Sequence, residues 1–375
     1  MRIVATCARG TEGALRRELT ELRLRHVKGS RGAVSFEGGL EDGMRACLWS
    51  RTAMRVLLPL TRFPVPDAAA LYEGARAVDW TEWLTERTTL AVDATGTSPA
   101  LRHTGFAALK VKDAVVDLLR DRLGARPDVD PKDPDVRIVL HVAKEEAELS
   151  LDLSGEPLHR RGWRARATEA PLKETLAAAI LRIGEVAADR PFLDPMCGSG
   201  TLAIEHLLAA RRIAPGLRRA FGFQRWPRYR GELQSAWDRL KEEARGQALP
   251  RAPVPARASD RSEEAVETAR HNARSAGVAG DLLLAVADAR DARPEGEGGT
   301  VCTNPPYGER VGGRPLQLGG FYRGIGEALR RFSGWSVVIL SGNPQLEREI
   351  GLHPEWTHPL WNGPLETRLV RYRIP

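Results

Sequence analysis

The sequence predicts an α/β protein in which a doubly wound, mostly parallel sheet follows a smaller α+β region. At 375 residues the chain is long enough for two or three domains. From residue 172 onward, short apolar strands alternate with helical runs, the order of a parallel sheet covered by helices. Before that residue the elements are short and form no such alternation, which favours small α+β units.

The N-terminal part divides into two α+β units and a linker. We expect a small unit over residues 1–60, a second over 61–155, and a basic linker over 156–171. The expected elements are strands at 3–6, 33–36, 136–142 and 149–153 and helices at 11–24, 68–75 and 106–123.

The C-terminal part, residues 172–375, should form the parallel sheet. Its expected strands are 192–194, 257–260, 282–288, 301–303 and 337–340, and its expected helices are 201–212, 262–276 and 318–332.

Composition excludes several classes of protein. The chain is 42% hydrophobic and 28% charged, which is typical of a folded domain. It has no apolar stretch of the ~20 residues that a bilayer requires, and its first residues show no signal-peptide pattern. The four cysteines lie far apart without a C-x-x-C pair, which argues against a zinc site or a disulfide framework. We therefore expect a cytoplasmic protein without a metal.

The basic charge is unevenly distributed. The net charge is +7, and a basic balance favours a nucleic-acid partner. Residues 1–155 contain equal numbers of basic and acidic residues, so residues 156–375 carry the whole excess. Attraction to phosphates should therefore concentrate in the C-terminal part.

A glycine-rich loop follows the strand at 192–194 and precedes the helix at 201–212. Such a loop lies at the carboxyl ends of parallel strands, where a cofactor can approach the backbone. A nucleoside-triphosphate loop is improbable because the segment has no lysine. Gly198-x-Gly200-x-x-Ala203 fits a loose dinucleotide fingerprint, yet the acid expected about 20 residues later is absent. A turn without a ligand is the simplest alternative.

Two acids end successive strands after this loop. Asp260 and Asp288 could accept hydrogen bonds from the ribose hydroxyls and the adenine amino group of an adenosyl ligand. Either acid alone would more often be an exposed helix N-cap. Their common register with the glycine loop favours the adenosyl cofactor.

The next strand ends in Asn304-Pro305-Pro306-Tyr307. The two prolines fix the backbone and donate no amide hydrogen bond, so the Asn304 amide oxygen and the Pro305 carbonyl could accept both N–H groups of a planar amine. Tyr307 could stack on the ring that bears the amine. The alternative is an ordinary turn with a partly buried tyrosine.

Taken together, Asp194-Pro-Met-Cys-Gly-Ser-Gly-Thr201 and Asn304-Pro-Pro-Tyr-Gly-Glu-Arg310 resemble motifs of the class I S-adenosylmethionine-dependent methyltransferases that modify exocyclic amines. The chain looks most like the bacterial large-subunit (23S) ribosomal RNA guanine-N2 methyltransferases, which carry a THUMP RNA-binding domain before the catalytic domain. In some members a second methyltransferase domain follows, and because this chain ends at Pro375 we expect only the guanine-N2 half. Further segments similar to that family's signatures are 5–10, 47–51, 149–155, 158–163, 170–176 and 362–366.

The resemblance implies a fold and a set of site residues. It implies a Rossmann-like methyltransferase sheet over 172–375, a THUMP-like domain over 61–155 and a ferredoxin-like unit over 1–60. It also implies direct, in-line methyl transfer to a flipped guanine. The implied catalytic residues are Asn304, Pro305 and Tyr307. The implied cofactor-binding residues are Glu174, Thr175, Asp194, Pro195, Cys197, Gly198, Gly200, Thr201, Asp260, Asp288, Ala289 and Asn304.

Two arginine-rich segments are candidates for RNA binding, because arginines with aromatic residues suit phosphate contact and base stacking. One is residues 159–166, and the other is residues 206–231, with seven arginines and no acid. The alternative for the second is a solvated insertion whose aromatics pack on the sheet. The candidate residues are Arg160, Arg161, Trp163, Arg164, Arg225 and Trp226.

The sequence thus predicts an S-adenosylmethionine-dependent methyltransferase that acts on a guanine 2-amino group in RNA, with ribosomal RNA as the first choice of partner. A transfer RNA guanine methyltransferase is the nearest alternative. A DNA adenine or protein glutamine methylase, a non-catalytic RNA-binding assembly factor and a nicotinamide enzyme are more distant ones.

Overall fold

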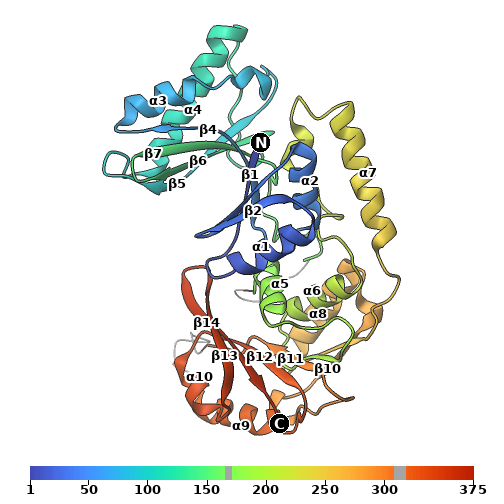
Figure 1. Cartoon of the computed structure of the whole chain (residues 1–375). Helices are drawn as coiled ribbons and strands as arrows, with labels where there is room; N and C mark the ends of the chain where they lie inside the picture. The colour runs from blue at the N-terminus through green and yellow to red at the C-terminus, as the bar shows by residue number, and fades with distance from the viewer. Residues whose placement is uncertain (165–170, 308–317) are drawn as a thin grey trace. The chain divides into compact units, whose positions relative to one another are not determined.

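A computed structural model describes residues 1–164, 171–307 and 318–375. Its contacts divide the chain into two compact units, each built around a seven-stranded sheet (Figure 1). The N-terminal unit comprises residues 1–6, 19–158 and 219–242. The C-terminal unit comprises residues 7–18, 159–218 and 243–375.

The sheet of the N-terminal unit has the strand order β2-β3-β1-β4-β7-β6-β5, in which only β5 and β6 are parallel. Its helix α4 (Thr104–Leu123) presents Ala107, Val111, Val115 and Leu119 at every fourth position, and all four are buried. The strands are β1 (Arg2–Thr6), β2 (Arg25–Ser30), β3 (Ala33–Glu37), β4 (Arg55–Pro64), β5 (Leu90–Thr97), β6 (Val136–Ala143) and β7 (Glu146–Asp152), with helices α2 (Leu40–Trp49) and α3 (Ala68–Arg76). Helix α1 (Glu12–Glu21) begins in the C-terminal unit and ends in this one.

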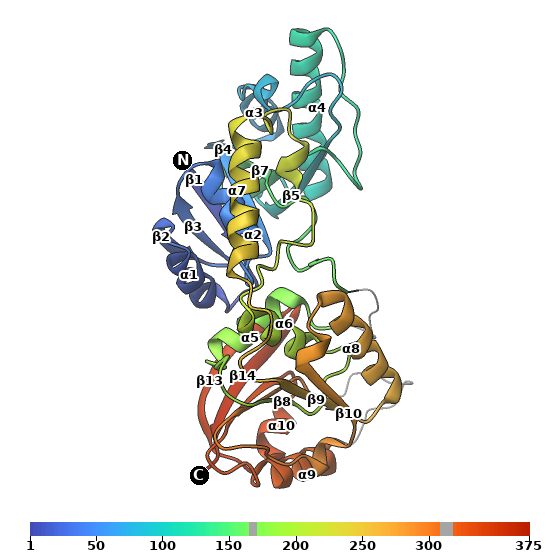
Figure 2. The same ribbon diagram turned by 90° about the vertical axis from the view of Figure 1, so that its right-hand side faces the viewer.

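Residues 219–242 pack on the N-terminal unit although they follow the glycine loop in the sequence. Phe221 and Phe223 each pack edge to face with Trp237. Trp237 lies on α7 (Glu232–Gln247), which runs beside α2 (Figure 2), and Arg239 of α7 lies 3.9 Å from Glu41 of α2. Gly222 lies against the backbone of residues 152–155, which leaves no space for a Cβ.

The sheet of the C-terminal unit has the order β10-β9-β8-β11-β12-β14-β13. The first five strands are parallel, β14 is antiparallel to β12, and β13 and β14 form a hairpin. The strands are β8 (Phe192–Asp194), β9 (Ala256–Asp260), β10 (Leu282–Val286), β11 (Thr300–Thr303), β12 (Ser336–Ser341), β13 (Pro354–Asn362) and β14 (Leu365–Arg373).

Helices cover both faces of this sheet. One buried cluster contains side chains of α5 (Glu174–Ile183), α6 (Thr201–Ala210) and α8 (Glu263–Ala276). The other contains side chains of α9 (Gly319–Leu329) and α10 (Pro344–Glu349). The predicted doubly wound, mostly parallel sheet is therefore confirmed. Chain order reverses between β8 and β11, and at such a switch point open α/β sheets bind their ligands.

Residues 7–18 complete the C-terminal unit from the other end of the chain. The Trp361 amide donates to the Arg9 carbonyl at 3.0 Å, and the Arg9 guanidinium lies 3.8 Å from the centre of the Trp361 ring. Gly10 has φ +90°, and a Cβ there would lie 2.3 Å from the Pro359 carbonyl oxygen. Each unit thus includes a segment that the linear order of the sequence assigns to the other.

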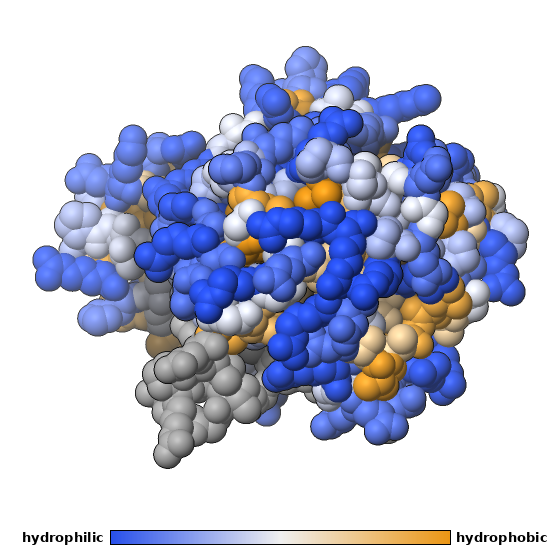
Figure 3. Space-filling model, turned by 90° about the horizontal axis from the view of Figure 1, so that it is seen from below, coloured by the Kyte–Doolittle hydropathy of each residue, from blue (hydrophilic) through white to orange (hydrophobic). Residues whose placement is uncertain are grey.

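Hydrophilic side chains predominate on the face of the molecule that Figure 3 shows, and the hydrophobic ones form separate patches. Within the ranges that the structure describes, no helix combines the length and apolarity needed to cross a membrane.

We expect Gly222→Ala to destabilise the N-terminal unit. The new Cβ would lie 2.9 Å from the Gly155 amide nitrogen and 3.0 Å from the Asp152 carbonyl oxygen, and backbone atoms cannot move aside as a flexible side chain can. Overpacking of this kind costs about 1–3 kcal/mol. Urea unfolding of the full chain would measure the loss.

The matched control is Gly246→Ala on α7, where a Cβ would meet nothing within 4 Å. That change should leave stability unchanged or raise it by about 0.5–1 kcal/mol, because alanine favours a helix. Equal stability of the Gly222→Ala variant and the wild type would contradict the close approach of residues 155 and 222.

Candidate functional site

The candidate site lies where the carboxyl ends of β8 and β11 meet. Leu193 of β8 pairs with Arg257 of β9 on one side and with Val301 of β11 on the other. The Thr303 hydroxyl at the end of β11 donates a 2.8 Å hydrogen bond to Asp194 Oδ1 at the end of β8. Parallel pairing therefore brings the predicted glycine loop and the Asn304 turn to one edge of the sheet.

The glycine loop is anchored on the side of β9. The Cys197 amide donates to the Ser259 carbonyl at 2.9 Å, and the Gly198 amide donates to Asp260 Oδ2 at 2.9 Å. Gly198 and Gly200 both have positive φ, +50° and +82°. A Cβ on Gly200 would lie 3.0 Å from the Ala269 side chain, whereas one on Gly198 would meet no atom within 4 Å. The backbone at Gly198 is thus exposed to open space where a ligand can approach.

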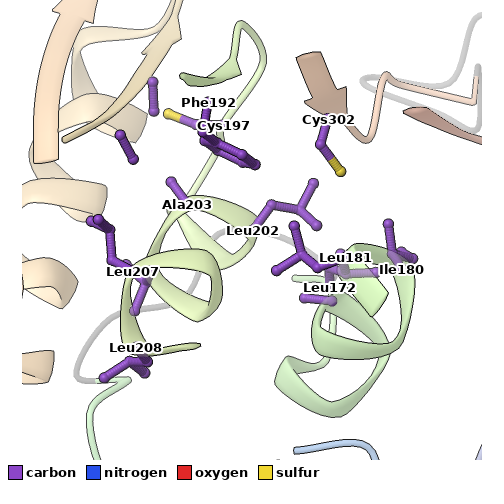
Figure 4. Close-up of a cluster of buried hydrophobic side chains, with 14 of the residues drawn as sticks. Leu172, Ile180, Leu181, Phe192, Cys197, Leu202, Ala203, Leu207, Leu208 and Cys302 are labelled. Carbon is purple, nitrogen blue, oxygen red and sulfur yellow. The ribbon is translucent and has the colours of Figure 1, made fainter. Parts of the chain in front are cut away.

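Other predicted loop residues face inward. Cys197 is 7% exposed, and its side chain belongs to a buried cluster that also contains Phe192 and Leu202 (Figure 4). Burial raises the pKa of its thiol well above the ordinary value. Pro195 and Thr201 are buried as well. The side chains of these three residues therefore offer little surface to a ligand.

The two strand-end acids are held in different ways. Asp260 accepts hydrogen bonds from the Gly198 amide and, at 3.0 Å, from the Ser262 amide, so it joins the glycine loop to the start of α8. Asp288 accepts from the backbone amide and the guanidinium of Arg290, at 2.7–2.9 Å. These contacts lower the pKa of Asp288 to about 2, so it is ionised at neutral pH.

Asp288 also has the ordinary role of a helix cap, since its side chain caps the short helical turn Ala289–Asp291. Ala289, the next predicted residue, is buried. Asp260 is not a cap, because Ser262 caps α8.

Asp194 is a buried carboxyl group, and none of the groups that shift its pKa is basic. It is 1% exposed and accepts from the Thr303 hydroxyl and the Met196 amide. Burial raises its pKa to about 7, and these two hydrogen bonds oppose the rise only in part. Both ionisation states are therefore populated near neutral pH.

The Asn304 turn is held by contacts that the sequence analysis missed. The Tyr322 hydroxyl donates to the Pro306 carbonyl at 2.7 Å, and Asn343 Nδ2 donates to the Tyr307 carbonyl at 3.0 Å. No local sequence signal links these residues to the turn, because Tyr322 lies on α9 and Asn343 is the N-cap of α10. Residues 308–310 of the motif lie outside the described residues.

Within the turn, the Tyr307 hydroxyl donates to Asn304 Oδ1 at 2.5 Å, and no described residue donates to the Pro305 carbonyl. The Tyr307 ring lies against the backbone at Gly342, where a Cβ would be 2.5 Å away. Burial raises the pKa of Tyr307, which keeps its hydroxyl protonated.

Glu174 and Thr175 start α5 beside the glycine loop and are only 3% and 4% exposed. The Arg164 guanidinium donates to Glu174 Oε1 at 2.7 Å and also to groups of the loop. Two segments far apart in the sequence are thereby joined at the site.

The structure corrects part of the predicted RNA surface in the linker. Arg161 and Trp163 are each 2% exposed, so a phosphate or a base has almost no surface of theirs to touch. Arg161 Nε lies 3.5 Å from Glu205 Oε1 on α6. Trp163 belongs to the buried cluster that contains side chains of α5, α6 and α8. Arg160 is exposed. Residues 165, 166 and 170 of the predicted segments lie outside the described residues.

The second segment shows the same correction. Trp226 is 4% exposed and packs edge to face with Trp83 at 5.5 Å. Its neighbour Arg225 keeps 36% of its side chain exposed and pairs with Asp133 at 2.8 Å. Phe221, Phe223 and Trp226 are therefore buried, as the alternative expected. They belong to the N-terminal unit, however, and not to the unit that contains the parallel sheet. Within the described ranges, no group of three or more histidine, cysteine or acidic residues could hold a metal ion.

Comparisons with known proteins match three parts of the chain. Residues 161–371 match the family model of the RMKL-like methyltransferase domain, 66–152 match the THUMP domain, and 2–57 match the RlmL ferredoxin-like domain. The chain is 45% identical, over its whole length, to the ribosomal RNA large subunit methyltransferase K/L of Syntrophotalea carbinolica and covers 54% of that protein. It thus spans about half the length of the curated relatives it matches.

Two solved structures resemble the whole chain. One is SMU.472, a methyltransferase candidate complexed with SAH, at 29% identity and a TM-score of 0.87, with 100% of this chain and 98% of that one covered. The other is a predicted N6-adenine-specific DNA methylase from Listeria monocytogenes, at 31% identity and a TM-score of 0.88, with 100% and 96% covered.

The two loop glycines should differ in their tolerance of alanine. Gly198→Ala places a Cβ in open space and should cost only the left-handed backbone strain, roughly 1–2 kcal/mol. Gly200→Ala adds a contact at 3.0 Å with Ala269, which should cost about 1–3 kcal/mol more. Thermal unfolding of both variants at one pH would compare them, and equal losses would contradict the open space at Gly198.

Asp194→Asn should change how stability depends on pH. The folded pKa of about 7 lies above the ordinary 3.8, so the wild type loses stability as pH rises from about 4 to 7. Asparagine keeps an oxygen for Thr303 and Met196 but cannot ionise. Between pH 5 and pH 8 the unfolding free energy of the variant should therefore rise relative to that of the wild type. The expected gain is about 1.4 kcal/mol for each tenfold difference between the ionisation constants of Asp194 in the unfolded and folded states. Parallel profiles of unfolding free energy against pH would refute this.

Proposed function

Because the chain belongs to the RMKL-like methyltransferase-domain family, we propose that it transfers a methyl group from S-adenosylmethionine to the 2-amino group of a guanine in large-subunit ribosomal RNA. The observation that carries the proposal is the meeting of the glycine loop and the Asn304 turn at the switch point of the sheet. A cofactor on one loop would there face an amine held by the other.

The residues around the loop fit an adenosyl cofactor. The Gly198 backbone borders open space, and the Asp260 and Asp288 carboxylates follow adjacent parallel strands. We assign the loop of residues 194–200 to the methionine part of the cofactor, Asp260 to the ribose, and Asp288 with Ala289 to the adenine. Carboxylate oxygens have lone pairs beyond those used in the present contacts, so both acids can accept further hydrogen bonds. When bound, S-adenosylmethionine supplies an electrophilic methyl group.

The Asn304 turn provides the acceptors that the reaction requires. The lone pair of a guanine 2-amino group is conjugated with the ring, so the amine is a weak nucleophile. Acceptance of its N–H groups by Asn304 Oδ1 and the Pro305 carbonyl would direct the lone pair out of conjugation and along the line of transfer. Since the Tyr307 hydroxyl now donates to Asn304 Oδ1, it must share or release that oxygen when an amine binds. The base must leave its stack to reach the turn.

RNA contacts are proposed from residues that keep an accessible charge. Of the candidate residues that the sequence suggested, Arg160 and Arg225 remain exposed at least in part. The THUMP match at residues 66–152 supports RNA rather than a protein as the partner. We place the activity in the cytoplasm, where ribosomal RNA is modified in bacteria.

A second candidate is methylation of adenine in DNA, since one similar structure is a predicted N6-adenine-specific DNA methylase. An adenine 6-amino group presents the same planar N–H pair to Asn304 and Pro305. The turn alone does not choose between the two bases, and the choice depends on which nucleic acid is bound.

Asn304→Ala tests the amine clamp. We expect methyl transfer to fall by about 100-fold or more, as when one preorganised hydrogen-bonding group is removed from a transition state. Affinity for S-adenosylhomocysteine, measured by calorimetry, should fall far less than methyl transfer, because the glycine loop, Asp260 and Asp288 are untouched. Transfer would be measured with labelled S-adenosylmethionine and unmodified large-subunit RNA, transfer RNA and duplex DNA, followed by nucleoside analysis.

N2-methylguanosine in the ribosomal RNA is the expected product. N6-methyladenosine in DNA would favour the second candidate. Full activity of Asn304→Ala would refute the clamp, and a wild type that binds no S-adenosylhomocysteine would refute the proposed cofactor.

A further inference from the structure

Arg164 joins three segments at the candidate site, and we propose that it is a positioning residue that holds the cofactor loop in its binding conformation. This inference rests on the proposed function. The Arg164 side chain donates from Nε to Glu174 Oε1 at 2.7 Å and from Nη1 to Ser199 Oγ at 3.0 Å. From Nη2 it donates to Thr201 Oγ1 at 2.9 Å and to the Leu172 carbonyl at 3.1 Å.

These contacts leave Arg164 little capacity to bind RNA, the role that the sequence suggested. A guanidinium has five N–H donors, and four here have partners within the C-terminal unit. The side chain is 17% exposed, and its charge is paired with Glu174, which is 3% exposed. Arg164 and Glu174 together present no net charge to a phosphate.

Arg164 holds the side of the loop that Asp260 does not reach. Asp260 binds the Gly198 amide, while Arg164 binds the side chains on either side of Gly200. Asn272 of α8 adds a third restraint, since its Nδ2 donates to the Ser199 carbonyl at 3.1 Å. Gly198, which borders open space, is thus fixed between restraints rather than by its own packing. A loop held in this way can bind a ligand without first losing conformational freedom.

The charge pair also explains why a cation is tolerated here. Thr201 begins α6, and the start of a helix carries a partial positive charge that disfavours a nearby cation. The Glu174 carboxylate compensates for the positive charge of Arg164 and for the partial positive charge at the start of α6. Through Arg164, the start of α5 is thereby linked to the start of α6. Lysine could not replace this arrangement, because one ammonium group lacks the planar fork that reaches several acceptors.

The test compares Arg164→Met with Arg211→Met in the full chain. Arg211 is a matched control: it is 16% exposed and donates to the Leu249 and Gly277 carbonyls, away from the loop. At a temperature where both variants are folded, S-adenosylhomocysteine should bind Arg164→Met at least tenfold more weakly than the wild type, and Arg211→Met within twofold of it. Arg164→Lys should not restore affinity. The salt dependence of RNA binding should be unchanged, because no phosphate contact is lost.

If Arg164→Met does not fold, Ser199→Ala replaces it, since this change removes one contact to the loop and leaves the Arg164–Glu174 pair intact. A threefold or greater loss of affinity is then expected. Wild-type affinity in the folded loop variants would overturn the inference alone. A shallower salt dependence with unchanged S-adenosylhomocysteine affinity would instead make Arg164 an RNA contact. A wild type that does not bind S-adenosylhomocysteine would overturn the proposed function and this inference with it.

Discussion

The parallel pairing of β8 with β9 on one side and β11 on the other is the constraint on which the candidate site depends. The strands β9 and β11 on either side of β8 each end in a residue that contacts the last residue of β8 or the loop that follows it. Asp260 binds the Gly198 amide, and Thr303 binds Asp194. A change of register by one residue would turn these side chains to the opposite face of the sheet and separate the loop from both neighbours. The geometry of the site is thus fixed by backbone pairing before any ligand binds.

Several arginines form hydrogen bonds and ion pairs that link segments around this sheet. Arg164 binds the loop, Arg161 lies beside the buried Glu205, and Arg371 pairs with Glu185 and Glu355. Burial of a cation is costly unless the cation has a hydrogen-bonded anionic partner. Arginine suits such positions because its planar guanidinium can donate to several acceptors at once. The basic excess of residues 156–375 is therefore a poor measure of accessible charge, since part of it is used within the fold.

Sequence patterns predicted the parts of the structure that depend on local order. The five parallel strands, three of their helices, the glycine loop and the Asn304 turn all follow from apolar periodicity and from Gly and Pro positions. The exchange of residues 7–18 and 219–242 between units was not predictable, because it depends on contacts between distant segments. Arginine next to tryptophan is ambiguous in the same way: the pattern at 161–164 suits RNA or a core, and only burial decides between them. Tyr322 and Asn343 carry no local signal at all, although they hold the turn.

Asp194 shows why a destabilising group can persist at such a site. Its ionised form is disfavoured by burial, and the nearby Asp260 adds to this cost. An apolar residue of similar size would avoid the cost but would leave the Thr303 hydroxyl and the Met196 amide without their acceptor, a loss of about 1–3 kcal/mol for each buried group. It would also remove the hydrogen bond that joins the end of β11 to the start of the loop. Because Thr303 directly precedes Asn304, that bond fixes the distance between the two halves of the proposed site. The carboxyl group therefore costs the fold stability at neutral pH while it holds both loops in place.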